Sequence, residues 1–233
     1  MPLFNTNALT IALLTVFFVV MLLDLFFVPL VVYIVYFRKI DKLINQCLPQ
    51  EGRQFAAERF FKRKRPDIKQ LLGTRYIYLS AFCEDVDSNY ETIVNGTIKG
   101  EYKYVQNVNF ALAAAMMWFV RGNAEKAEEL CKKVKTAPPK KPSPLLQSGL
   151  QICEIFLFEK ESEQFQKISE FMQDNENSSN LSPFRKSILY FRQYQLSGQK
   201  ELIERCLAAG PNELTRKTLL ALASGASIGG DAT

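Results

Sequence analysis

The first 37 residues form an almost uninterrupted apolar block, and the pattern changes abruptly after it. From Ala8 to Phe37 the only interruptions are Thr10, Thr15, Asp24 and Pro29. About 20 apolar residues are enough to cross the hydrocarbon core of a bilayer. Residues 8–37 are therefore predicted to form one transmembrane helix after a short N-terminal segment, 1–7. The length of the block and the absence of basic residues before it favour a retained anchor over a cleaved signal peptide.

Asp24 is the one charged residue in this predicted helix. A carboxylate near the centre of a lone helix costs a few kcal/mol on insertion scales. One prediction is that Asp24 contacts a partner helix or a second copy inside the membrane. The alternative is that the span is displaced so that Asp24 lies near the membrane surface. A hairpin that enters and leaves at 24–29 is a third reading. Thirty helical residues would measure about 45 Å against roughly 30 Å of hydrocarbon, a surplus that tilt or a kink at Pro29 would absorb.

Beyond the anchor, helical periodicity replaces the apolar block, and residues 107–141 show it most clearly. A first apolar stripe stops at Gly122 and consists of Ala111, Ala114, Ala115, Trp118 and Phe119. A second stripe ends before Pro138 and Pro139 and consists of Ala124, Ala127, Leu130, Cys131 and Val134. Two stripes separated by a glycine predict a helical hairpin whose helices face each other.

This stretch resembles a tetratricopeptide repeat. The resemblance is carried by five repeat-defining residues: Ala115, Trp118, Gly122, Ala127 and Pro139. It covers about 34 residues and departs from the family pattern where Val134 replaces a late alanine and Ala111 an early tryptophan. The resemblance implies stacked helical hairpins that bind a protein or peptide partner.

Weaker copies of the pattern lie on both sides, with turns predicted near residues 52, 87, 122, 160 and 198. A spacing of this kind is expected when each unit is two helices and a loop. We expect an all-α fold: one N-terminal transmembrane helix followed by an α-solenoid of such hairpins. The predicted divisions are a basic juxtamembrane helical segment (38–65), a repeat domain (66–224) whose last helix is 212–224, and a flexible Gly-rich tail (225–233).

Charge is concentrated beside the anchor. Residues 38–65 hold nine Lys and Arg against three Asp and Glu, whereas residues 66–233 hold twenty of each sign. Basic residues directly after a span predict a cytoplasmic body and an N-terminus outside. The run Lys62, Arg63, Lys64 and Arg65 is also expected to attract anionic lipids at the membrane surface, unless it is only a topology signal or a docking site for a partner. A charge-balanced body argues against nucleic acid as a partner.

Candidate chemistry is sparse. The chain has no histidine and five widely spaced cysteines, which argues against a disulfide framework and a zinc site, and each cysteine is expected in a helical core. The acidic group Glu84, Asp85 and Asp87 is expected to end one helix and cap the next rather than bind a metal. No catalytic motif is present, so no enzyme activity and no cofactor are predicted.

Aromatic and arginine residues are the remaining candidates for a binding surface. Most are expected in the core, while some tyrosines together with Arg75, Arg121 and Arg192 are candidates to line a concave groove. The candidate tyrosines and the phenylalanine beside them are Tyr76, Tyr78, Tyr90, Tyr102, Tyr104, Tyr190, Phe191 and Tyr194. We therefore expect a membrane-anchored, non-catalytic protein-interaction scaffold or adaptor. The alternative is an accessory subunit of a larger membrane complex that contacts its partners through the transmembrane helix and Asp24.

Overall fold

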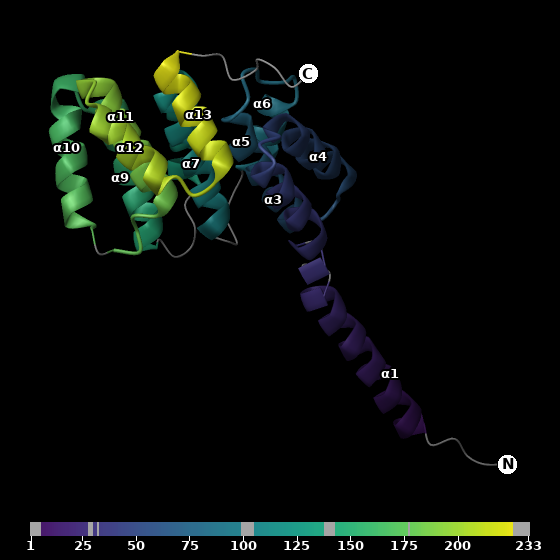
Figure 1. The fold of residues 1–233 in the computed structure, drawn as a ribbon. Coiled ribbons are helices and arrows are strands. Elements are labelled where there is room, and N and C mark those ends of the chain that lie inside the picture. The colour runs from purple at the N-terminus through teal and green to yellow at the C-terminus, as the bar shows by residue number, and fades with distance from the viewer. Residues whose placement is uncertain are drawn as a thin grey trace. The chain divides into compact units, whose positions relative to one another are not determined.

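The computed structural model describes residues 6–27, 30–31, 33–98, 105–137, 143–176 and 178–225. All regular structure in these ranges is helical (Figure 1). The chain divides into two compact units, Met1–Lys42 and Leu43–Thr233.

The first unit consists of apolar helical segments followed by the charged start of the next helix. They are α1 (Thr6–Leu22), the π-helical turns η1 (Leu23–Phe27) and η2 (Tyr33–Phe37), and the start of α3 (Arg38–Asn45). Residues Thr10–Phe27 are long and apolar enough to cross a membrane, and all of them are exposed. Asp24 lies within this stretch, in η1. Pro29, the site of the expected kink, lies outside the described residues.

The second unit consists of short helices. They are α4 (Pro49–Lys62), α5 (Pro66–Ser80), α6 (Tyr90–Thr97), α7 (Val105–Val120), α8 (Ala124–Thr136), α9 (Pro144–Phe158), α10 (Glu161–Asp174), α11 (Pro183–Ser197), α12 (Lys200–Ala209) and α13 (Glu213–Ser224). Proline begins α4, α5, α9 and α11, at the position where its missing N–H costs least. Helix α13 begins after Asn212 as expected, and the Asn212 side chain accepts a hydrogen bond from the Thr215 N–H at 2.9 Å.

The α7–α8 pair forms the hairpin expected from the sequence. Gly122 ends α7 with φ +85°. Its N–H bonds the Phe119 carbonyl at 2.8 Å, and the Asn123 N–H bonds the Trp118 carbonyl at 2.9 Å. These two bonds form a Schellman motif, which needs a left-handed residue at the position of Gly122. Asn123 then caps α8 by accepting from the Lys126 N–H at 3.2 Å.

Helices α5, α9 and α11 pack on this hairpin, and the others pack on these three. Helix α7 contacts α5, α9 and α11, while α10 and α12 pack against α11. The Gln195 amide of α11 donates to the Val120 carbonyl at the end of α7, at 2.7 Å. In a simple solenoid each hairpin contacts only its neighbours, whereas α11 reaches back past α9 and α10 to α7. This return brings the starts of α11 and α13 near α5 and α7.

The turn predicted near residue 52 is wrong. Gly52 lies inside α4, where it is buried, and a Cβ there would meet the Leu79 Cδ1 at 3.0 Å. The glycine therefore allows close approach of α4 to α5. A turn lies before it, at 46–47, where Cys47 has φ 57°. Cys47 is accordingly half-buried in a turn rather than part of a helical core, while the other four cysteines are buried as expected. Breaks between helices do occur at the other four predicted turns.

Candidate functional site

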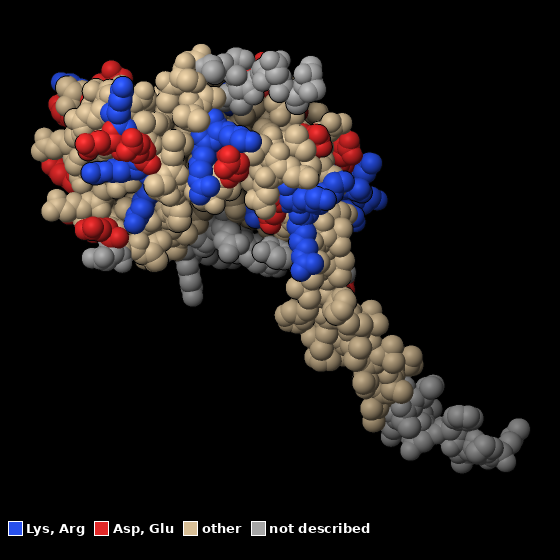
Figure 2. Space-filling model, viewed as in Figure 1, with Lys and Arg blue, Asp and Glu red and all other residues tan. Residues whose placement is uncertain are grey.

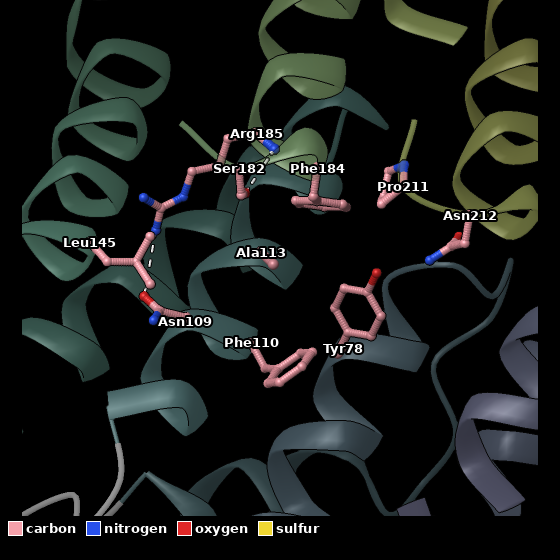
Figure 3. A pocket seen from close by; sticks show the side chains of 10 residues that line it. All are labelled: Tyr78, Asn109, Phe110, Ala113, Leu145, Ser182, Phe184, Arg185, Pro211 and Asn212. Carbon is pink, nitrogen blue, oxygen red and sulfur yellow. Dashed lines mark hydrogen bonds between the residues drawn. The ribbon is translucent and has the colours of Figure 1, made fainter. Parts of the chain in front are cut away.

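A cavity of about 280 Å³ lies where α5, α7, α9, α11 and the start of α13 converge (Figure 3). Its lining residues are Tyr78, Asn109, Phe110, Ala113, Leu145, Ser182, Phe184, Arg185, Pro211 and Asn212. In Figure 3, Asn109 and the Arg185 guanidinium lie at one side of the space, beside Leu145, and Tyr78, Pro211 and Asn212 lie at the other. The cavity therefore has one cationic side, and the rest of its described lining is uncharged.

Three aromatic rings form the apolar part of the lining. The Tyr78 ring meets Phe110 edge to face with centroids 5.3 Å apart, and meets Phe184 with centroids 6.0 Å apart. The Arg75 guanidinium covers the Phe110 ring at 3.5 Å from its centroid. Burial raises the pKa of Tyr78 to about 12, so its phenol stays protonated at neutral pH. Packing of this kind fixes the rings in place before any ligand arrives.

Arg185 is the one charged side chain among the described residues that line the cavity, and it is only 4% exposed. Its Nη1 donates to the Ser148 hydroxyl and, at 2.9 Å, to the Asn180 carbonyl. Its Nη2 reaches the Asn109 side-chain oxygen at 3.5 Å. These acceptors are all neutral, and no carboxylate forms an ion pair with Arg185 in the part of the chain that the structure describes.

Gly149 on α9 makes room for this guanidinium. A Cβ at Gly149 would lie 2.5 Å from Arg185 Nη2 and 2.9 Å from Leu112 Cδ1. The glycine is thus required by a close approach between α9 and the arginine. Because a buried cation loses hydration that neutral acceptors replace only in part, burial lowers the pKa of Arg185 to about 10. The group remains charged at neutral pH.

The starts of two helices add to the positive potential at the cavity. Ser182 caps α11 by accepting from the Arg185 N–H, and Asn212 caps α13, and both caps line the cavity. A helix N-terminus carries about half a positive charge. With no acidic residue among the described lining residues, the cavity is electrostatically suited to an anion.

Arg185 was not among the sequence candidates, although its position carried a signal. It precedes Ile188 and Leu189 by three and four residues, which places it on the buried stripe of α11. Of the candidate tyrosines, Tyr78 lies in the cavity lining. Tyr102 and Tyr104 lie outside the described residues.

The three arginines proposed for a groove have other surroundings. Arg75 lies on the Phe110 ring behind the cavity lining. Arg121 donates to the Ala81 and Cys83 carbonyls at the end of α5. Arg192 donates to Gln164 and forms a 2.9 Å ion pair with Glu161. Arg121 and Arg192 therefore join neighbouring helices and do not line this cavity.

The repeat-defining residues are mostly buried. Ala115, Trp118 and Ala127 are at most 3% exposed, in the α7–α8 hairpin. Gly122 forms the turn between the two helices, and Pro139 lies outside the described residues. Ala115 and Ala127 are buried within the hairpin, and the Trp118 ring also meets the Tyr90 ring of α6, with centroids 6.4 Å apart.

The four residues of the basic run at the end of α4 differ in their exposure. Lys62 and Lys64 are exposed, Arg63 is half-buried, and Arg65 forms a 3.1 Å ion pair with Asp67. On the face in Figure 2, charges of both signs are interspersed over the second unit, while α1 carries none. The two lysines are the members of the run most available to a membrane surface.

Asp87, the last residue of the acidic group after α5, makes contacts that hold the structure together. Asp87 accepts from the Tyr76 hydroxyl and from the Asn89 N–H, just before α6, and pairs with Arg53 at 3.5 Å. No cluster of metal-binding side chains occurs among the residues described.

No family model, no curated protein and no solved structure matches this chain.

Proposed function

We propose that this chain is a membrane-anchored, non-catalytic adaptor whose helical body binds a protein partner and holds it at the membrane. In this proposal the apolar helix spans the bilayer once, the N-terminus lies outside, and the body, a helical array of tetratricopeptide type, lies in the cytoplasm. The observation that carries the proposal is the fully exposed apolar stretch Thr10–Phe27, joined to a separate, well-packed helical unit. An exposed apolar stretch of this length supports a membrane-spanning role.

Anchoring and exposed basic side chains support a binding role at the membrane. Anchoring raises the effective concentration of a weakly bound partner near the membrane. Lys62 and Lys64 would hold the body close to an anionic leaflet, because basic side chains at that surface contribute about 1 kcal/mol each.

Crosslinked capture from the native membranes tests the proposal. The intact chain is compared with a variant that keeps residues 1–48 and replaces the rest with an unrelated soluble domain. An adaptor retains its partner with the intact chain and loses it with the variant. A partner retained equally by both would refute the adaptor role, because the body would then be dispensable.

Asp24 favours a second candidate, an accessory subunit of a membrane complex. It lies in the apolar stretch within a π-helical turn, a distortion that often occurs at functional sites. In this case a stoichiometric membrane partner should copurify in mild detergent and dissociate in an Asp24→Leu variant. Unchanged copurification of that partner from the variant would exclude the contact through Asp24.

A further inference from the structure

We propose that the cavity between α5, α7, α9 and α11 binds a small carboxylic acid with an aromatic or short aliphatic body. The carboxylate binds Arg185, and the apolar body lies against Tyr78, Phe110 and Phe184. The inference does not rest on the adaptor role, since a small ligand can bind whether or not the body also binds a protein.

The charge of the ligand follows from the hydrogen bonds of Arg185. A guanidinium has five N–H donors. The bonds described for Arg185 use both donors on Nη1 and one on Nη2, the latter at 3.5 Å. These bonds leave the Nε–H of Arg185 unused. The edge formed by Nε and Nη2 is the one that a carboxylate accepts as a bidentate pair, and a bound carboxylate there would replace or share the long Asn109 contact.

A buried arginine bonded only to neutral acceptors favours an anion over a neutral ligand. An added carboxylate supplies the counter-charge that no described lining residue provides. The N-termini of α11 and α13, capped at Ser182 and Asn212, act in the same direction. A cationic ligand would face repulsion from all three groups.

The size and body of the ligand follow from the rest of the lining. About 280 Å³ is at the small end of the range for ligand pockets, roughly 300–1,000 Å³. This volume favours a short organic acid over a long-chain lipid. The Tyr78 ring lies across the space from the Arg185 guanidinium (Figure 3). Together with Phe110 and Phe184 it offers edges and faces to an aromatic body.

The test uses 3-phenylpropanoate as the probe and its neutral amide as the matched control. Binding is measured by saturation-transfer NMR on the full-length protein in phospholipid nanodiscs, with empty nanodiscs subtracted. For so small a ligand we expect a Kd on the order of 0.1 mM for the acid. The amide should bind about tenfold or more weakly, because it loses a charge-assisted bidentate bond.

Two variants test the two sides of the cavity separately. Arg185→Gln removes the cation, and Ala113→Leu fills the cavity from α7 without touching the charge. Both should abolish measurable binding. Arg192→Gln is the control, because Arg192 lies on the same helix but does not line the cavity. It should bind the acid as the unmodified chain does.

The proposal is overturned if the acid does not bind, if the amide binds equally well, or if Ala113→Leu binds as the unmodified chain does. Circular dichroism establishes that each variant is folded. If Arg185→Gln does not fold, the amide comparison and Ala113→Leu still decide the question. None of these results bears on capture of a protein partner, so failure here is distinct from failure of the adaptor role.

Discussion

Replacing Gly73 with alanine should force two helices of the body apart. Gly73 is buried on α5 and faces Thr97, the last residue of α6. A Cβ at Gly73 would lie 2.9 Å from Thr97 Cβ and 3.0 Å from Thr97 Cγ2, with Thr97 Oγ1 closer still. Rotation about χ1 moves the Thr97 Oγ1 and Cγ2 but leaves the Thr97 Cβ in place, at 2.9 Å. The clash can therefore be relieved only by moving the backbone of α5 or α6.

The magnitude follows from two opposing effects. Overpacking a well-packed core typically costs about 1–3 kcal/mol. Alanine in place of glycine inside a helix stabilises the folded state by about 0.5–1 kcal/mol, because it loses less backbone entropy on folding and has the higher helix propensity. We expect a net loss of roughly 1–2 kcal/mol in the free energy of unfolding. With a urea m-value of about 2 kcal/mol/M for a domain of this size, the midpoint should fall by about 0.5–1 M.

Pulse proteolysis of the full-length protein across a urea series measures this midpoint without removing the anchor. Gly96→Ala is the matched control, because Gly96 is exposed on α6 and its Cβ would approach only the tip of the Phe60 ring, at 3.1 Å. That variant should be neutral or slightly stabilised. Thr97→Gly removes all three clashing atoms, so Gly73→Ala should cost nothing in the T97G background.

Two results would refute this reasoning. The first is a Gly73→Ala midpoint equal to or above that of the unmodified chain. The second is the same cost in the Thr97 and T97G backgrounds, because a double-mutant cycle with no coupling would mean that the two residues do not touch.

Three further predictions concern the hairpin, the topology and the membrane surface. Ala127→Phe should cost about 1–3 kcal/mol in the same assay, since Ala127 is 1% exposed. Ala124→Phe, at an exposed position of the same helix, should be neutral, and equal effects would contradict the buried contact. Cys47, the only cysteine that is not buried, should react with a membrane-impermeant maleimide after permeabilisation but not in intact cells; rapid labelling of intact cells would place the body outside. Replacing Lys62 and Lys64 with Gln should weaken binding of residues 43–233 to anionic vesicles about 30-fold at low salt, and less at high salt. Unchanged binding would leave the run as a topology signal alone.

Features set by neighbours in the chain were accessible from the sequence. The apolar block up to Phe37 is a matter of composition, and its length predicts a span without reference to the rest of the fold. Gly122 and Asn212 mark helix ends because one accepts a left-handed conformation and the other caps a helix with its own side chain. Buried Trp118 and Ala127 follow from helical periodicity within one hairpin. Each of these depends on only a few adjacent residues.

Features set by contacts between distant segments were not accessible from the sequence. Gly52 was predicted as a turn because glycine breaks helices, but the approach of Leu79 from α5 gives it a packing role inside α4. The cavity joins Tyr78, Asn109 and Arg185 from three helices, and no sequence pattern relates their positions. The buried stripe of α11 could have marked Arg185 as unusual, but not its acceptors on α7 and α9. Only the return of α11 onto α7 decides which side chains meet, because that packing is a property of the whole assembled body.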